Sequence, residues 1–349
     1  MISSFAILLL LTVVSTITTT TAFCPVVICP GFGNDAIDYQ EPLEQPREVG
    51  LVSCLERRGF DPDQIYIVPV QRWDWIKVFT GGLLDVPKFY LGQAQPTGGG
   101  YGWYVQRLKE TIDTAYNNNN AGNEKVLVIG HSAGGWLARA AMGDGIWNEE
   151  EQVRTAERIR ALVTIGAIHQ PPTDPSKCVT RGALAYTNEW YPGAFLAKEG
   201  ISYISVGGNT IVGDNNNQQE TNNNIDSNTI LTEEQLKRRT KASRVAYTAY
   251  ESVCGEGTVS GDGVVPLEWS LLEGSRHIPL DGVFHSINEA GTTLPTDRWY
   301  GAENVIDQWL PAVLEEAKIK TKNNNNNVAE SNNLWNSGNE IQQISFLRK

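Results

Sequence analysis

The sequence predicts an α/β fold, with a mostly parallel central sheet, helices on both of its faces, and cap and loop insertions. Short β-branched runs alternate with stretches of helical periodicity, and this order is typical of a parallel sheet joined by crossover helices. The chain has 349 residues, enough for one large α/β domain with insertions. We therefore expect a single domain over residues 23–318.

The predicted strands are short apolar runs, each ended by glycine, proline or polar residues. They cover residues 25–30, 65–70, 125–130, 159–167, 201–208 and 276–282. Helical patterns lie between several of these strands, over residues 42–58, 101–117 and 132–145. The first predicted strand runs directly into GFGND, which reads as a tight turn.

Four segments interrupt the alternation. Residues 171–200 are rich in proline and aromatic residues and are expected to form a cap or a long loop. Residues 209–240 and the tail 319–349 contain asparagine tracts, so both are expected to be disordered. The apolar stretch Trp75–Leu91 and the 171–200 segment fit either a lid over an acyl pocket or ordinary core packing.

The first 22 residues differ from the rest of the chain. Their apolar run, MISSFAILLLLTVV, has no charged side chain and is shorter than the roughly 20 apolar residues that a membrane-spanning helix needs. Small residues at Thr20 and Ala22 precede Phe23, which predicts a signal peptide over residues 1–22. The alternative is an uncleaved signal anchor. Either way, the segment predicts entry into the secretory pathway, with an endomembrane or extracellular location.

The charge balance and the cysteines narrow the function further. With 28 basic and 40 acidic side chains, the protein is acidic, which disfavours nucleic acid and anionic membranes as partners. A transient contact with a membrane surface stays open. No CxxC pair and only four histidines are present, so we expect no metal site and no cofactor. A disulfide is permitted, but the spacing does not assign one, among Cys24, Cys29, Cys54, Cys178 and Cys254.

A candidate nucleophile lies in residues 130–134, GHSAG, which match the pattern G-x-S-x-G. KVLVI before it reads as a buried strand and GGWLARAAM after it as a helix, the setting that a nucleophile elbow requires. Small neighbours suit the strained backbone of such a serine, and the helix N-terminus directs N–H groups toward a developing oxyanion. We predict Ser132 as the nucleophile. The alternative is a glycine-rich helix start without a chemical role.

A serine nucleophile needs a base, and the base needs an orienting acid that precedes it in this architecture. His285, in PLDGVFHS, follows the last predicted strand and is the predicted base. His277 lies at the opposite end of that strand, and His131 belongs to the elbow itself. His169 precedes every suitable acid, although it is close enough to line the pocket.

Asp262, in SGDGVVP, is the predicted acid. It follows the 201–208 strand and precedes His285 by 23 residues, and its flanking glycines suit a turn that projects the carboxylate. A solvated turn aspartate is the alternative role for this residue. Asp281 is the second candidate, but its position four residues before His285 places it at the strand end.

An oxyanion hole requires two N–H donors beside the nucleophile. One is the N–H of Ala133, directly after Ser132. The other is predicted to be the N–H of Phe32, in the PGFG turn that follows the first strand. A plain glycine turn without a catalytic role is the alternative for this motif.

Four motifs occur in order: VVICPGFGN, VIGHSAGGWLAR, GDGVVP and LDGVFHS. With them the chain resembles the α/β-hydrolase superfamily, lipase and esterase branch, over residues 25–315. More narrowly, it is similar to a group of largely uncharacterised plant and algal hydrolases assigned to plastids, some of which are placed near phospholipid and GPI-lipid deacylases. The resemblance implies the same triad and oxyanion hole. One departure is GAIHQPP at 166–172, where many lipases have GTPH, although His169 matches.

The resemblance implies a serine hydrolase that cleaves carboxylic esters, and lipid acyl esters in particular. The alternatives are a thioesterase or acyltransferase with the same triad, or a non-catalytic binding protein on the hydrolase fold. It also implies a second location, the plastid, reached through a bipartite signal. Against that location, the first strand begins at Pro25 and leaves almost no room for a transit peptide.

Overall fold

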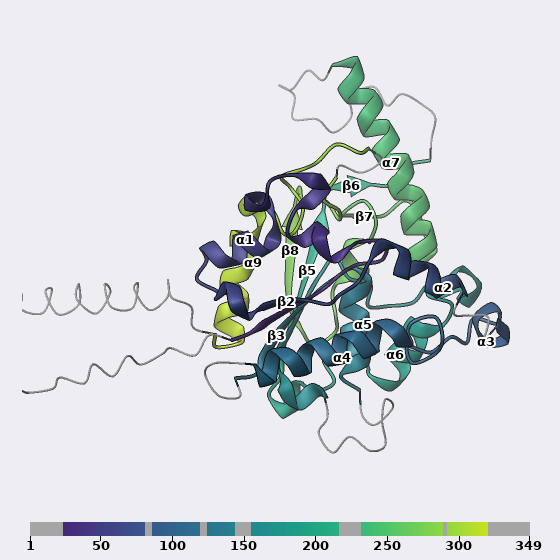
Figure 1. The fold of residues 1–349 in the computed structure, drawn as a ribbon. Helices are drawn as coiled ribbons and strands as arrows, with labels where there is room; N and C mark the ends of the chain where they lie inside the picture. The colour runs from purple at the N-terminus through teal and green to yellow at the C-terminus, as the bar shows by residue number, and fades with distance from the viewer. Residues whose placement is uncertain are drawn as a thin grey trace, which may run out of the picture.

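A six-stranded sheet forms the centre of the molecule (Figure 1). The computed structural model describes residues 24–80, 86–118, 124–143, 155–215, 232–288 and 292–319. The strand order is β2-β1-β3-β4-β5-β8, and every pair is parallel. The strands are β1 (Val26–Cys29), β2 (Ile65–Ile67), β3 (Val126–His131), β4 (Ile159–Ile165), β5 (Ser202–Asn209) and β8 (Arg276–Asp281). The predicted fold class is confirmed.

Helices cover both faces of this sheet (Figure 1). On one face lie α4 (Gly102–Asn117) and α5 (Ala133–Ala141), which share a core with Val27 and Val128. On the other face, α1 (Leu51–Arg57) and α9 (Glu303–Glu316) share a core with Ile28 and Ile129. Because both faces are covered, β1 and β3 are buried along their whole length, which explains their continuous apolar sequences.

The predicted helix over residues 42–58 is wrong in its first half. Residues Pro42–Glu44 and Arg47–Val49 form short 3₁₀ segments, and the α-helix begins only at Leu51. Leu43 has a left-handed backbone with φ 53°. Pro46 excludes the helical conformation at the residue before it, so the chain must turn there.

The predicted disorder over 209–240 is also wrong at both ends of the segment, where a short strand and the start of a helix are found. Helix α7 (Glu233–Cys254) begins within that segment, and a capping box between Thr232 and Gln235 starts it. A two-stranded antiparallel sheet, β6 (Ile211–Val212) with β7 (Ser260–Gly261), accompanies it. Residues 216–231, which contain most of the asparagine tract between β6 and α7, lie outside the described residues. The predicted signal peptide and the tail beyond residue 319 also lie outside them.

The two predicted cap or lid segments contain both core and surface side chains. The 171–200 segment holds α6 (Ala183–Trp190), whose Ala183 and Leu184 belong to the core beside α5. The 75–91 stretch forms α2 (Lys77–Thr80) and α3 (Val86–Tyr90), with residues 81–85 outside the described ranges. Its Trp75, Val78 and Phe89 are buried, whereas Phe79, Tyr90 and Leu91 are exposed.

The five cysteine thiols are all free and buried. Burial raises the pKa of the Cys24 thiol to about 12, so it stays protonated at neutral pH. Within the described ranges, no helix combines the length and apolar character needed to cross a membrane.

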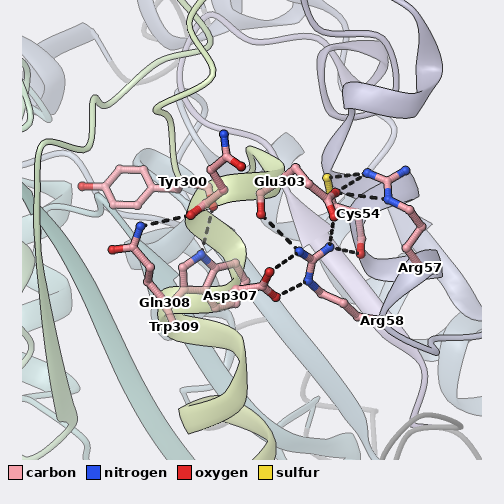
Figure 2. Close-up of polar contacts among 9 residues, drawn as sticks. Cys54, Arg57, Arg58, Tyr300, Glu303, Asp307, Gln308 and Trp309 are labelled. Carbon is pink, nitrogen blue, oxygen red and sulfur yellow. Dashed lines mark hydrogen bonds and ion pairs between the residues drawn. The ribbon is translucent and has the colours of Figure 1, made fainter.

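A network of ion pairs joins α1 to α9, as Figure 2 shows. Arg58 donates to both carboxylate oxygens of Asp307, at 2.6 and 2.7 Å, and to the backbone oxygen of Cys54 at 2.9 Å. It also pairs with Glu303 at 3.0 Å, and the neighbouring Arg57 reaches the same carboxylate. Arg58 has 14% of its side chain exposed, whereas the carboxylates of Glu303 and Asp307 are 48% and 66% exposed, so solvent screens part of this network.

We expect Arg58→Met to lower the free energy of unfolding by about 1–2 kcal/mol, because it removes several charge-assisted hydrogen bonds at once. Urea unfolding measures the change. The matched control is Lys237→Met on α7, which breaks an exposed pair with Glu233 and should cost less than about 0.5 kcal/mol. Equal losses in the two variants would contradict a structural role for the α1–α9 network.

The same network predicts a loss of stability in acid. The hydrogen bond from Arg57 lowers the pKa of Glu303 from 4.5 to about 2. A carboxylate whose pKa is lower in the folded state stabilises it above the unfolded pKa and loses that contribution as the pH falls. The stability difference between wild type and Glu303→Gln should therefore be present above pH 4.5 and disappear as the pH falls toward 2. A difference that is constant over this range would exclude the pair as its source.

Candidate active site

Ser132 lies at the junction of β3 and α5 with a strained backbone, φ 51° and ψ −122°. Residues other than glycine rarely adopt a positive φ, and such strain is found at functional sites. The neighbouring glycines permit it: a Cβ on Gly130 would collide with Gly135, and a Cβ on Gly134 would collide with the backbone of Cys29. The backbone N–H of Ser132 is held by the carbonyl of Ile165 at 3.0 Å. The predicted nucleophile thus has the geometry of an elbow.

Asp262 and His285 are in direct contact. His285 Nδ1 lies 2.8 Å from Asp262 Oδ2, and both side chains are buried. The other carboxylate oxygen, Oδ1, accepts the N–H groups of Val264 at 3.0 Å and Val265 at 2.7 Å. The backbone N–H of His285 also donates to the backbone oxygen of Asp262 at 2.9 Å. The predicted acid is therefore held in a tight turn, and the predicted base is attached to that turn by two hydrogen bonds.

Tyr300 is a member of this site that the sequence did not reveal. Its hydroxyl donates to Asp262 Oδ2 at 2.8 Å and accepts the backbone N–H of Gly208 at 2.7 Å. Burial raises the pKa of Tyr300 well above its ordinary value, so the phenol stays protonated and remains a donor. Trp309 of α9 donates to the backbone oxygen of Tyr300 at 2.9 Å, which connects the site to the helix pair of Figure 2. No local sequence pattern marks this tyrosine.

We expect Tyr300→Phe to lower kcat on an ester substrate by roughly three- to tenfold with little change in KM, because one hydrogen bond to the carboxylate is lost. Steady-state kinetics measure both constants. Tyr101→Phe is the matched control, since its buried hydroxyl donates to the backbone of Thr180 and does not touch Asp262. A change in KM alone for Tyr300→Phe would argue against an action through the carboxylate.

His131 links the turn after β1 to the backbone of His285. Its Nε2 lies 2.9 Å from the carbonyl oxygen of His285, which only accepts, so Nε2 carries the proton. Its Nδ1 therefore accepts the hydroxyl of Tyr39 at 2.8 Å, and that hydroxyl accepts the N–H of Gly31 at 2.9 Å. Burial lowers the pKa of His131 to about 3, so the ring is neutral at physiological pH. The sequence indicated His131 only as a residue of the elbow.

The turn predicted to complete the oxyanion hole lies against the nucleophile. A Cβ on Gly31 would come within 2.9 Å of the Ser132 Cβ. Among the described residues, the N–H groups of Phe32 and Ala133 have no hydrogen-bond acceptor. The Phe32 ring packs on Trp75 with 5.1 Å between ring centroids and is 49% exposed. The Ser132 hydroxyl makes no hydrogen bond to His285 in the described structure, and such contacts often form only with bound substrate.

The other candidates from the sequence lie elsewhere. Asp281 is exposed at the end of β8, where Asn209 donates to it at 3.2 Å. His277 is held at the start of β8 by the carbonyl of Leu272 at 2.8 Å. His169 is buried, with its Nε2 2.9 Å from the hydroxyl of Thr164. The part of the chain that the structure describes contains no group of three or more side chains suited to a metal ion.

Comparison with protein families gives one partial match. Residues 102–239 match the family model of the PGAP1-like alpha/beta domain. This stretch includes Ser132 but ends before Asp262 and His285. A search of curated protein sequences found no match.

Three similar solved structures are hydrolase or synthase enzymes by name. The Bacillus licheniformis lipase BlEst2 in its mature form is 12% identical, with a TM-score of 0.42 over 78% of this chain and 88% of that chain. A dienelactone hydrolase from Anabaena variabilis is 17% identical, with a TM-score of 0.28 over 54% and 63%. Tomato methylketone synthase I with 2-tridecanone is 14% identical, with a TM-score of 0.23 over 44% and 42%.

The structure combines a parallel sheet of order β2-β1-β3-β4-β5-β8 with a strained serine at the junction of β3 and α5. The family match covers the stretch that contains this junction. The chain therefore has an α/β-hydrolase fold.

Proposed function

We propose that the protein is a serine hydrolase that cleaves carboxylic esters, with Ser132 as nucleophile, His285 as base and Asp262 as acid. The observation that carries the proposal is the strained Ser132 elbow combined with the buried His285–Asp262 pair at 2.8 Å. A strained serine at a strand–helix junction and a buried imidazole–carboxylate pair are features expected of an acyl-transfer site, and this supports the proposal.

The reaction follows from the positions of these groups. Ser132 Oγ attacks the ester carbonyl while His285 Nε2 takes its proton, and Asp262 stabilises the imidazolium through Nδ1. The N–H groups of Phe32 and Ala133 bind the oxyanion. His285 then protonates the leaving alcohol, and water releases the acyl group by the same steps. A chain of hydrogen bonds runs from the N–H of Gly31 through Tyr39 and His131 to the backbone oxygen of His285. It holds the Gly31–Phe32 turn and the His285 backbone in fixed positions relative to each other.

The surface beside the oxyanion turn supports a lipid acyl ester as substrate. Phe32 is 49% exposed, and next to it Phe79 of α2 is 65% exposed, with 6.2 Å between ring centroids. A hollow of about 840 Å³ lies along the neighbouring segment, where the exposed Trp73 and Ile76 share its lining with five charged side chains, Asp35, Asp38, Glu41, Glu44 and Arg72. Apolar side chains exposed in such number near one site are a feature of surfaces that bind apolar ligands. The resemblance to lipid deacylases points the same way, and a secretory or endomembrane location would be consistent with it.

A fluorophosphonate probe and an ester series test the proposal. The full chain should be labelled at Ser132, as peptide mapping would show, and should hydrolyse p-nitrophenyl esters with a maximum at long acyl chains between acetyl and palmitoyl. A maximum at short chains would keep the hydrolase mechanism and exclude the lipid substrate. Preference for an acyl thioester, or transfer to an added alcohol, would indicate the thioesterase or acyltransferase alternative. An unlabelled and inactive protein would favour a binding function.

A further inference from the structure

One helix of this acidic protein carries a surplus of positive charge. Between Glu233 and Tyr250, α7 has five basic and two acidic side chains, whereas the whole chain has 28 basic and 40 acidic ones. No acidic side chain occurs between Gln235 and Tyr250. Salt screens exposed charges beyond roughly 10 Å, so a partner at this helix meets the local charge rather than the net charge of the chain. The acidic composition therefore does not exclude an anionic partner here.

The basic side chains form a row on the outer face of α7. Ala246 and Tyr250 mark the inner face, where both are fully buried in a small apolar cluster. Lys237, Lys241 and Arg244 are spaced by four and three residues, so they lie above one another along the helix. At about 3.6 residues per turn, this row lies half a turn from the inner face. All three side chains are exposed.

Two glutamates at the start of α7 balance only part of this charge. Glu233 and Glu234 accept from basic side chains one turn further on, at 2.5 and 2.6 Å. Arg239, Lys241 and Arg244 come in addition to these pairs. Exposed pairs of this kind are weak and are screened by salt, so they do not prevent the binding of a larger anionic surface.

Helix α3 is connected to α7 through the 171–200 segment. The N–H of Ala94, just after α3, donates to the carbonyl of Arg181 at 2.8 Å. In the same segment, Lys177 pairs with Glu251 of α7 at 3.9 Å. Figure 1 shows α3 and α7 on the same side of the molecule. Side chains that protrude from the two helices can therefore contact the same external surface.

Exposed apolar side chains accompany the basic row. Val245, next to Arg244 on α7, is 40% exposed. Tyr90 and Leu91, at the end of α3, are 78% and 70% exposed. Basic side chains together with aromatic and aliphatic ones are typical of helices that bind in the interfacial region of a membrane. Tyrosine suits this region because its ring is apolar and its hydroxyl is polar.

We propose that the outer face of α7 binds a membrane surface that contains anionic phospholipids. The basic row pairs with the phosphate and carboxylate groups of the lipids, and the exposed apolar side chains enter the interface beside it. An acidic protein segment would pair with the basic row as well, but it would leave the exposed Tyr90 and Leu91 unexplained. A membrane accounts for both features.

The inner face of α7 connects this surface to the proposed active site. The Tyr250 hydroxyl accepts the N–H of Gly263, the residue after Asp262, at 2.8 Å. It also donates to the carbonyl of Ile211 at 2.9 Å. Binding through α7 thus holds the proposed active site at a surface that contains lipid esters. The membrane contact does not depend on the proposed reaction, so Ser132→Ala should bind vesicles as the wild type does.

Flotation of the full chain with phospholipid vesicles tests the proposal. Vesicles with about 30% phosphatidylserine in phosphatidylcholine should carry the protein upward in a density gradient at about 0.1 M salt, and about 1 M salt should release it. Pure phosphatidylcholine vesicles should bind it on the order of tenfold less tightly. A variant with Lys237→Gln, Lys241→Gln and Arg244→Gln should lose the preference for phosphatidylserine.

The matched control carries the same change of charge at the other end of the sheet. It combines Lys125→Gln, Lys198→Gln and Lys318→Gln, three exposed lysines near the residues at which β3 and β5 begin. This variant should keep the preference for phosphatidylserine. Equal losses in the two triple variants would show that only the net charge matters and would overturn the proposal.

A single substitution covers the case in which the three glutamines disturb α7. Lys241→Glu reverses one charge with another good helix former and should weaken binding on the order of tenfold, whereas Lys198→Glu should not. Equal binding to vesicles with and without phosphatidylserine would overturn the proposal. Tighter binding to poly-glutamate than to vesicles would identify an acidic protein as the partner and would overturn it as well.

Discussion

Substituting Ser132 by alanine is expected to lower kcat for ester hydrolysis by roughly 10⁴- to 10⁶-fold, because the acyl-enzyme can no longer form. The residual rate would come from the oxyanion donors and from substrate binding. The fold should be unaffected, since alanine at φ 51° is no more strained than serine and the N–H bond to Ile165 involves only the backbone. Kinetics on the preferred p-nitrophenyl ester and an urea unfolding curve measure the two effects.

The control for this variant is Ser176→Ala, which removes a surface hydroxyl bonded to Asp174 and should leave kcat unchanged. If Ser132→Ala kept more than about a tenth of the wild-type kcat, another group would have to be the nucleophile. If it lost activity together with stability, the loss could not be assigned to chemistry.

Asp262→Asn should be almost as damaging, with a loss of roughly 10⁴-fold in kcat. Oδ1 of the carboxylate accepts two backbone N–H groups, so an asparagine placed there would turn its oxygen to that side. Its amide nitrogen would then face His285 Nδ1 and Tyr300, where Oδ2 had accepted both. His285 would adopt the tautomer with the proton on Nε2, which cannot accept the proton of Ser132. The base would be present but in the wrong protonation form.

The matched control is Asp281→Asn, the other aspartate near His285 in sequence. It is exposed, bonded to Asn209 and not in contact with the imidazole, so its kcat should equal that of wild type. Measured kcat values for the two variants distinguish the candidates directly. A loss in Asp281→Asn and none in Asp262→Asn would reverse the assignment of the acid.

Local patterns in the chain were sufficient to predict much of the fold and the elbow. The strand β3, Ser132 and α5 are contiguous, so the change from strand to helix periodicity around GHSAG can be read directly. The start of α7 carried a local signal as well, the capping box of Thr232 and Gln235, but the adjacent asparagine tract dominated the composition of the segment. The helix predicted over residues 42–49 is wrong for the opposite reason. The spacing of the apolar residues is typical of a helix, but Pro46 prevents one.

The predicted acid and base form an intermediate case. In this architecture an acid and then a histidine follow the serine along the chain, and both lie at the carboxyl edge of the sheet. That order predicts Asp262 and His285 without knowledge of their contacts. The 2.8 Å contact itself depends on the turn at Asp262, where the N–H of Gly263 donates to the hydroxyl of Tyr250 on α7 at 2.8 Å, and the sequence prediction did not include α7.

The remaining contacts join segments far apart in the chain, and packing alone brings them together. Tyr300 meets Asp262 across 38 residues, and Tyr39 meets His131 across 92. Arg139 meets Asn188 across 49 residues, beneath a segment whose composition suggested only a cap or loop. Periodicity shows which side chain is buried, since burial follows one face of a helix or strand. Periodicity does not show which polar atom a buried side chain will contact, because that contact depends on how the elements are arranged on the two faces of the sheet.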